Sequence, residues 1–293
     1  MDGLTSNSTS FSNSPSSSNT PYSGSDNLES YAFPAPKRAL HDGAKTPLVL
    51  VACGSFSPPT ILHMRMFEMA CDYVRLNTEF EVVGGYLSPV NDTYHKAGLV
   101  IKMCEAACSY DDVFTVDPWE ALQKEYQPTA VVLDHFNHEI NIVNGGIKTP
   151  TDERKPARIA LLAGADLIQT MSTPGLWSDK DLDHILRQYG VFVVERQGTD
   201  LEQALGGLKQ WSENIFVIPQ LVQNDISSTR IRLLLRRSMS VKWLIPAKVA
   251  EYIEKNGLFA GDGTMSPYDK GKDKGRQLGD ATAGSVAAAS APR

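Results

Sequence analysis

Apolar residues in the middle of the chain alternate between short continuous runs and longer stretches with helical spacing. Six of the runs have the length and β-branched content of buried strands. They cover 47–53, 81–87, 113–116, 158–163, 191–195 and 215–218. Because these runs are mostly apolar and alternate with helical stretches, they predict a parallel sheet that helices cover on both faces.

The stretches between the runs carry apolar residues three and four positions apart, which predicts helices. In the first stretch, Leu62, Met66 and Met69 recur from about Thr60 onward. The other predicted helices span 101–108, 119–126, 129–143, 179–189, 228–236 and 246–256. This alternation indicates an α/β protein with a Rossmann-like, doubly wound parallel sheet in a single domain.

The two ends of the chain differ from the middle in composition. Residues 1–45 are rich in serine, and residues 262–293 contain few large apolar side chains. Such segments cannot bury enough apolar surface to offset the entropy of ordering them. We therefore expect disordered tails around one folded domain at 46–261. Within that domain, the length of the polar loop at 144–156 indicates a mobile segment.

Charge and cysteine content narrow the classes of function. The net charge of −6 argues against a nucleic-acid-binding surface. No apolar run is long enough to cross a bilayer, and the start of the chain lacks the pattern of a secretory signal. The cysteines lie in apolar segments without zinc-type pairing: Cys53, Cys71, Cys104 and Cys108. Buried reduced thiols predict the nucleus and/or the cytoplasm.

A candidate phosphate site follows the first predicted strand. Gly54, Ser55 and Phe56 open a loop rich in serine and proline, and His63 lies one turn inside the next helix. Glycine lets a phosphate approach the backbone, and a helix N-terminus offers free N–H groups. A histidine there can contact a triphosphate and stabilise charge as pyrophosphate leaves. A chance Gly- and Pro-containing loop beside a core histidine explains this segment alone about equally well.

A second candidate site lies in the segment Asn224–Arg232. Serine and threonine hydroxyls cap a predicted helix whose first turns carry Arg230 and Arg232. Arginine in a first turn opposes the helix dipole, and a bound phosphate would resolve that conflict. We therefore predict that Ser228 and Thr229 donate to phosphate oxygens while the arginines neutralise a triphosphate. A solvated basic helix is the simpler alternative.

Together the two motifs resemble the nucleotidyltransferase superfamily, and most closely the nicotinamide mononucleotide adenylyltransferase family of eukaryotic type. Further matching segments follow in the family's order. They are Ser88–Tyr94, Val116–Glu120, Leu162–Leu167, Gly175–Trp177 and Val194–Arg196. The resemblance implies transfer of AMP from ATP to nicotinamide mononucleotide or nicotinic acid mononucleotide in NAD biosynthesis. The products would be NAD or deamido-NAD, with pyrophosphate.

The resemblance also implies a mechanism. The mononucleotide phosphate attacks the α-phosphorus of ATP in line, so catalysis is mostly positioning and charge stabilisation. By this similarity His63 and Arg232 are catalytic, and Mg²⁺ is held through the ATP phosphates rather than by protein ligands. The expected partners are small-molecule nucleotides, with no nucleic acid and no membrane, and the class is compatible with a homo-oligomer.

The same similarity divides the site residues between two ligands. Those implied to bind ATP are Gly54, Ser55, Phe56, His63, Gly164, Asp166, Asn224, Ser228, Thr229, Arg230 and Arg232. Those implied to bind the mononucleotide are Ser55, Tyr94, Lys96, Trp119, Leu176, Trp177 and Arg196. Trp119 and Trp177 would flank the nicotinamide ring, because an aromatic face suits a flat, electron-poor ring. Core packing is the alternative role for both.

The sequence departs from the family pattern at two places. Pro59 stands where the family commonly has an aliphatic residue, at a helix start that tolerates proline. After Leu99 the chain runs directly into Val100–Met103 and lacks the His-Arg pair that the family usually carries. A nucleotide-binding regulatory or chaperone-like homologue with little turnover is therefore one alternative. A cytidylyl- or other adenylyltransferase is another, against which the two tryptophans argue.

Overall fold

The computed structural model describes Leu28 and residues 30–91, 97–196 and 200–260. Its centre is a six-stranded sheet in the order β3-β2-β1-β6-β7-β8, and every pairing in it is parallel. The strands are β1 (Thr46–Gly54), β2 (Phe80–Pro89), β3 (Phe114–Val116), β6 (Arg158–Gly164), β7 (Val191–Val194) and β8 (Ile215–Ile218). All six predicted strands are confirmed, and their ends differ little from the prediction.

The strand order reverses at β1. This strand pairs with β2 on one side and with β6 on the other, so Gly54 and Gly164 end two neighbouring parallel strands. In a doubly wound sheet, the connections leave such a pair in opposite directions and open a crevice where ligands bind. The switch point therefore lies between the two glycines.

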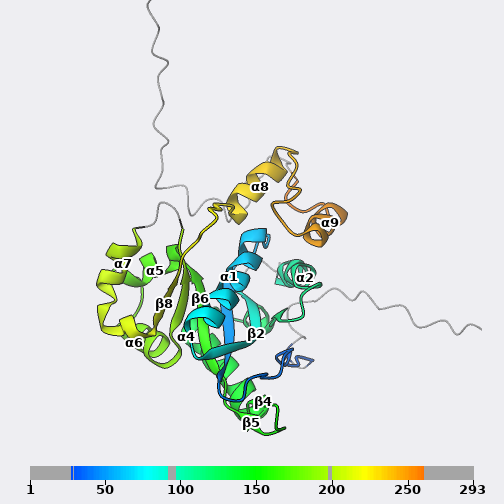
Figure 1. Cartoon of the computed structure of the whole chain (residues 1–293). Coiled ribbons are helices and arrows are strands. Elements are labelled where there is room, and N and C mark those ends of the chain that lie inside the picture. Colours follow the sequence, from blue (N-terminus) through cyan, green and yellow to red (C-terminus); the bar gives the residue numbers. More distant parts are fainter. Residues whose placement is uncertain (1–27, 29, 92–96, 197–199, 261–293) are drawn as a thin grey trace, which may run out of the picture.

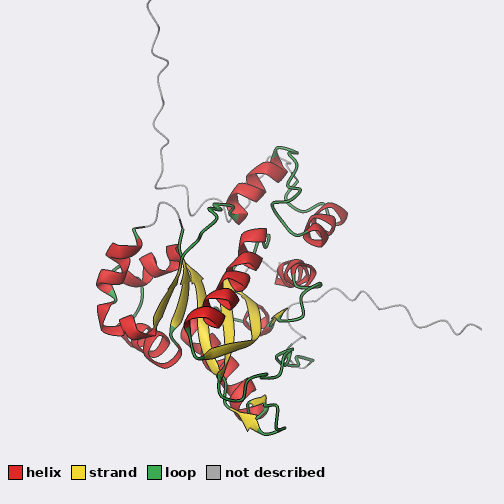
Figure 2. Cartoon of the chain, viewed as in Figure 1, coloured by secondary structure: helices red, strands yellow, loops and turns green. Residues whose placement is uncertain are grey.

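Helices cover both faces of the sheet, as Figure 2 shows. One layer holds α1 (Ile61–Asn77), α2 (Ala97–Ala107), α8 (Ser228–Arg236) and α9 (Ala247–Lys255). The other holds α4 (Thr129–Asn137), α5 (Ala165–Ser172), α6 (Asp179–Asp183), α7 (Leu201–Gly207), the π-helical segments η1 (His138–Val143) and η2 (His184–Tyr189) and the 3-10 helix η3 (Lys209–Asn214). The short helix α3 (Trp119–Leu122) follows β3.

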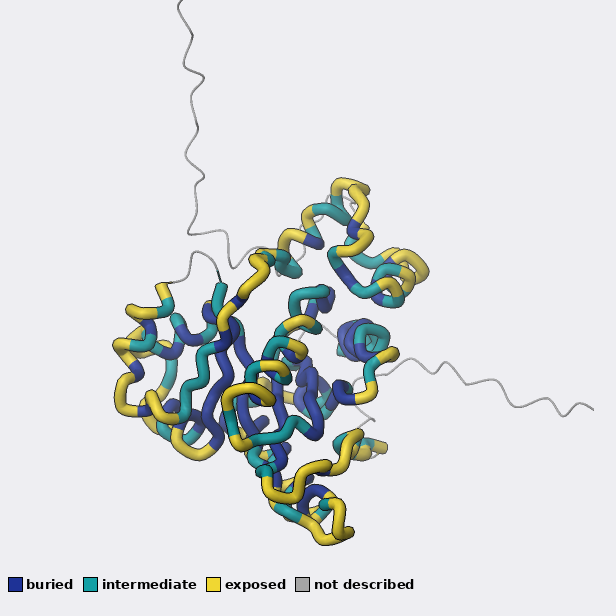
Figure 3. The backbone as a smooth tube through the Cα atoms, in the orientation of Figure 1, coloured by how far each residue is buried: buried dark blue, intermediate teal, exposed yellow. Residues whose placement is uncertain are grey.

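Side chains of β1 alternate between the two layers. Leu48 and Leu50 belong to one buried cluster, while Val49 and Val51 belong to the other, and all four are fully buried. Figure 3 shows this buried core running along the strands. The apolar run at the first strand is therefore continuous because both of its faces are covered. None of the described helices is both long and apolar enough to cross a bilayer.

Several helices differ from the prediction. The structure adds α5 and α7, which the sequence pattern did not reveal, and α2 begins at Ala97 instead of residue 101. The helix predicted over 119–126 ends after Leu122, because Gln123 adopts an extended conformation (φ −67°, ψ 151°). Within the predicted loop at 144–156, β4 (Ile147–Lys148) and β5 (Arg154–Lys155) pair as a short antiparallel hairpin. The mobility of that segment stays a prediction.

The folded part of the chain begins before Thr46, so the predicted tail boundary is wrong for residues 30–45. Leu40 is only 2 % exposed, and its N–H donates to the carbonyl of Lys148. The N–H of Arg38 donates to the carbonyl of Val83 in β2. These residues lack a local apolar period, but they make long-range contacts that a composition argument cannot detect.

Candidate nucleotide-binding site

The loop after β1 and the N-terminus of α8 are joined by direct hydrogen bonds. The Ser228 hydroxyl donates to the carbonyl of Pro58 at 2.8 Å, and the Arg232 guanidinium donates to the carbonyl of Ser57 at 2.7 Å. Figure 1 shows α8 beside the start of α1, at the carboxyl end of β1. The two motifs singled out in the sequence therefore meet at one end of the sheet.

His63 is held by the N-cap of α1. The backbone N–H of Thr60 donates to Nδ1 of His63 at 2.9 Å. Because a backbone N–H can only donate, Nδ1 accepts, and a neutral His63 carries its proton on Nε2. Burial, together with the charge of Arg196, lowers the pKa of His63 to about 4. The imidazole is therefore neutral at pH 7 and offers Nε2–H to an acceptor.

Phe56 shapes the loop from inside. Its ring is buried and packs edge-on against His63, with 5.2 Å between ring centroids. A Cβ atom on Gly54 would lie 3.2 Å from the Phe56 ring, closer than most such contacts. Glycine at the end of β1 therefore makes room for the Phe56 ring. Phe56 itself has a φ of 38°, in the left-handed region that few side chains adopt.

The α8 end of the site is built from the protein's own polar groups. Ser227 is the N-cap, and its side chain accepts from the N–H of Arg230. The Arg230 guanidinium pairs with the carboxylate of Asp225. Arg232 also donates to the hydroxyl of Thr229 at 3.2 Å. Both arginines are thus already oriented by acceptors close to the loop.

Arg196 connects three parts of the site. It follows β7 and forms an ion pair with Asp166, at 2.5 Å, in the first turn of α5. It also donates to the carbonyl of Asp225, just ahead of α8. Gly164, at the end of β6, has open space where a Cβ would lie. Asp166, predicted to bind ATP, and Arg196, predicted to bind the mononucleotide, are therefore brought together.

The predicted pyridine-binding residues lie on the opposite layer of the sheet. Trp119 and Trp177 are partly buried against the same core cluster, and the indole N–H of Trp177 donates to Thr170 at 3.1 Å. Leu176 is 64 % exposed. Simultaneous contact of both indoles with one ring stays a prediction. The remaining mononucleotide residues, Tyr94 and Lys96, lie outside the described residues.

Two buried acidic residues beside Trp119 were not predicted as site residues. Asp117 is 1 % exposed and Glu120 is 2 % exposed, and the Ser88 hydroxyl donates to the Glu120 carboxylate at 2.5 Å. Burial raises the pKa of Glu120 to about 7, against the effect of the Ser88 hydrogen bond. Polar residues directly after a buried strand were the signal for this pair, but burial itself cannot be read from the sequence.

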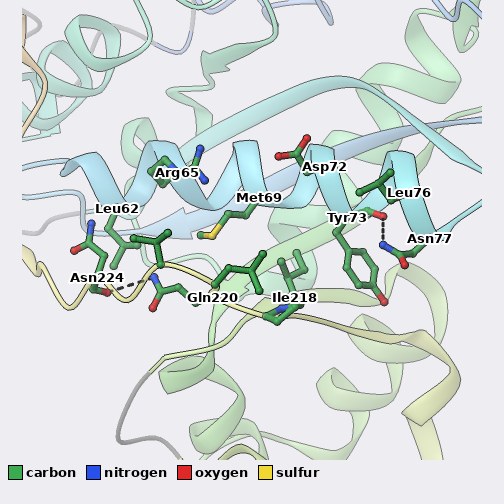
Figure 4. Close-up of a pocket in the computed structure, with 13 residues that line it drawn as sticks. Leu62, Arg65, Met69, Asp72, Tyr73, Leu76, Asn77, Ile218, Gln220 and Asn224 are labelled. Atoms are coloured by element: carbon green, nitrogen blue, oxygen red, sulfur yellow. Dashed lines mark hydrogen bonds between the residues drawn. The ribbon is translucent and has the colours of Figure 1, made fainter.

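A separate cavity of about 490 Å³ lies between α1 and the chain after β8. Figure 4 shows Met69 and Tyr73 on one side and Gln220 on the other. Of the predicted site residues, Asn224 alone lines it, and the Asn224 side chain accepts from the N–H of Ile226 at 3.0 Å. Within the described residues, this cavity is therefore next to the candidate site and not part of it.

The fold and the site are those of one class of protein, the cytidylyltransferase-like family. A model of the cytidylyltransferase-like family matches residues 51–234, and the joined loop and basic helix lie inside that range. A solved structure, described as Plasmodium falciparum nicotinic acid mononucleotide adenylyltransferase complexed with NaAD, has a TM-score of 0.52 at 17 % identity. It covers 73 % of this chain and 97 % of its own, and it supports the fold alone.

Curated relatives narrow the class to one family. Nicotinamide/nicotinic acid mononucleotide adenylyltransferase 1 of Saccharomyces cerevisiae is 51 % identical over 243 residues, which are 79 % of this chain and 61 % of the relative. The enzyme of that name from Arabidopsis thaliana is 39 % identical over 77 % of this chain and 97 % of its own length. The chain belongs to the nicotinamide/nicotinic acid mononucleotide adenylyltransferase family. It spans about 61–66 % of the length of the yeast relatives.

Proposed function

We propose that this chain transfers AMP from ATP to nicotinamide mononucleotide or nicotinic acid mononucleotide, producing NAD or deamido-NAD and pyrophosphate. The observation that carries the proposal is the direct junction between the loop after β1 and α8. The loop that leads into the helix of His63 is bonded to the helix that carries Arg230 and Arg232, which supports a shared phosphate site. The names of the relatives support the same reaction.

The described residues suit this chemistry. Nε2–H of His63 donates to a phosphate oxygen of ATP, and Arg232 stabilises the charge that develops as pyrophosphate leaves. The mononucleotide phosphate is the nucleophile, so no side chain need form a covalent intermediate. Gly164 leaves space at the end of β6, and Asp166 accepts from the ribose hydroxyls of adenosine. Catalysis then depends on holding two substrates in line.

Mg²⁺ enters this proposal as part of the ATP complex. Among the residues that the structure describes, no group of three or more His, Cys, Asp or Glu side chains is arranged to hold a metal ion. The site instead presents arginines and N–H donors, which suit phosphate oxygens. We therefore expect Mg²⁺ to be held by the triphosphate, where it supplies charge neutralisation.

The test is an assay of purified chain with Mg·ATP and each mononucleotide in turn, with detection of NAD or deamido-NAD. Product formation with either acceptor supports the proposal, and the ratio of the two kcat/KM values gives the substrate preference. Absence of product, together with absence of nucleotide binding, rejects it. A panel of other acceptors, including cytidylyl-transfer substrates, tests the related enzymatic alternative.

One observation favours a second candidate function, a nucleotide-binding regulatory or chaperone-like role with little turnover. Helix α2 starts at Ala97, so Leu99 already lies inside the helix where the family pattern has additional residues and a His-Arg pair. Tight binding of both nucleotides without product would support this candidate. The four cysteines are free thiols, and we propose a reducing location, the nucleus and/or the cytoplasm.

A further inference from the structure

Three side chains from distant parts of the chain form a closed hydrogen-bonded network. The Tyr31 hydroxyl donates to one carboxylate oxygen of Asp117 at 2.9 Å, and Nε2 of His135 lies 3.0 Å from the other. The Tyr31 oxygen is also 3.0 Å from the same Nε2. Because the carboxylate only accepts, both Tyr31 and His135 point a proton toward Asp117.

Two of the three side chains are shielded from water, and Tyr31 is half-buried. Asp117 is buried, and the His135 side chain is 8 % exposed. Burial, and then the Asp117 charge, raises the pKa of Tyr31 above its ordinary value, so the hydroxyl remains a donor. A buried carboxylate is costly unless its oxygens are hydrogen-bonded. Tyr31 therefore supplies part of what keeps Asp117 stable in this position.

Both partners of Tyr31 hold Trp119. The His135 imidazole stacks on the indole with 4.1 Å between centroids and 7° between planes. Asp117 accepts from the backbone N–H of Trp119 at 3.2 Å. One face of the indole is therefore covered by His135, and a flat ligand can stack only on the other face. The orientation of that face is determined by His135 and Asp117.

The segment that carries Tyr31 is anchored on its C-terminal side. The Phe33 ring packs against Tyr86 and edge-on against Phe136, with centroids 5.5 and 5.8 Å apart. The hydroxyl of Tyr86 donates to the carbonyl of Pro34 at 2.7 Å. Figure 1 shows this segment in dark blue ahead of β1. The segment that holds Tyr31 against Asp117 is therefore itself packed on β2 and α4.

We propose that residues 31–34 belong to the mononucleotide site, and that Tyr31 is a positioning residue that orients the Trp119 indole through Asp117 and His135. The ligand class is a pyridine mononucleotide whose ring stacks on the face of Trp119 opposite His135. This inference rests on the proposed function, because it takes Trp119 as the pyridine-stacking residue.

The experiment compares Tyr31→Phe with the unchanged full-length chain. Removal of one hydroxyl leaves the packing in place but takes a donor from Asp117. The KM for nicotinamide mononucleotide should rise by about three- to tenfold, the range of the net contribution of an ordinary hydrogen bond. The KM for ATP and the kcat should stay unchanged. Quenching of indole fluorescence by the mononucleotide gives its Kd independently of turnover.

Tyr189→Phe is the matched control. The Tyr189 hydroxyl also donates to an aspartate of α4, Asp134, at 2.5 Å, next in sequence to His135 but without a described contact to Trp119. This variant should keep both KM values. A second variant, His135→Phe, preserves an aromatic ring against Trp119 but removes the hydrogen bonds, and it should reproduce the Tyr31→Phe effect.

The outcomes separate the inference from the function on which it rests. If Trp119→Ala leaves the Kd of the mononucleotide unchanged, the pyridine site itself is misassigned. If Trp119→Ala weakens binding while Tyr31→Phe does not, the site stands and the positioning role is wrong. Equal effects of Tyr31→Phe and Tyr189→Phe, or an equal rise in both KM values, would show a general structural effect and overturn the inference.

Discussion

Replacement of Glu120 by glutamine should change how stability depends on pH. The carboxyl is 2 % exposed, and burial raises the pKa of Glu120 to about 7 from an ordinary value of 4.5. The folded state therefore binds the proton more tightly than the unfolded state. The resulting stabilisation is complete below about pH 4.5 and is lost as the pH rises through about 7.

The size of the effect follows from the two pKa values. Each unit of pKa difference corresponds to about 1.4 kcal/mol, so the full difference is about 3 kcal/mol, of which about 2 to 3 kcal/mol falls between pH 5 and pH 8. Urea unfolding of the wild-type chain and of Glu120→Gln at both pH values measures it. The unfolding free energy of Glu120→Gln minus that of the wild-type chain should be higher at pH 8 than at pH 5 by about 2 to 3 kcal/mol.

Comparing the two proteins at both pH values removes two other contributions to the unfolding free energy. The hydrogen bond between Ser88 and the glutamine contributes equally at both pH values because glutamine does not titrate, and the other titrating groups are common to both proteins. Glu202→Gln, at an exposed position in the first turn of α7, is the control and should show no comparable shift. If the unfolding free energies of Glu120→Gln and the wild-type chain differ by the same amount at pH 5 and pH 8, the carboxyl at this position is not held neutral by burial.

Three further predictions concern the phosphate end of the site. Arg232→Ala should lower kcat/KM by about 10²- to 10³-fold, as loss of a charge-stabilising donor does, whereas Arg237→Ala at the far end of α8 should leave it unchanged in the same assay. ATP binding near pH 6 should take up more protons in the wild-type chain than in His63→Gln, because a nearby anion raises a pKa that burial holds at about 4. Calorimetry in buffers of different ionisation enthalpy measures the uptake. Asp225→Asn should tighten ATP binding by about two- to fivefold in the same titrations, because it frees Arg230 from an exposed ion pair.

The strands were predictable because their signal is local. Each is a short, mostly apolar run, buried on both faces in the central strands β1, β6 and β7, and this pattern differs from the helical spacing of the segments between them. Helices α5 and α7 were missed because they are short, eight and seven residues, and α7 ends in Gly206-Gly207. The segment before β1 was missed for another reason. Phe33 and Leu40 are isolated apolar residues whose partners lie far along the chain.

The residues of the candidate site also differ in how far the sequence could predict them. His63 and the arginines of α8 lie in compact motifs, so their residue types and spacing indicate phosphate chemistry. The support of Trp119 could not be read from the sequence, because it depends on Tyr31 and His135, which lie 104 residues apart. The sequence could indicate that Trp119 follows a strand, but not which face of its indole is covered.

The arginines of α8 illustrate why a local conflict in a sequence is informative even when the folded chain partly resolves it. In the structure, Asp225 pairs with Arg230, and the carbonyl of Ser57 accepts from Arg232. The unfavourable interaction with the helix dipole is therefore offset without a ligand. An exposed ion pair is weak, however, and a triphosphate with several charges competes with it effectively. The carbonyl of Ser57 thus holds the Arg232 guanidinium in position until the stronger anion arrives, which lowers the ordering cost of binding, whereas Arg230 must first leave Asp225.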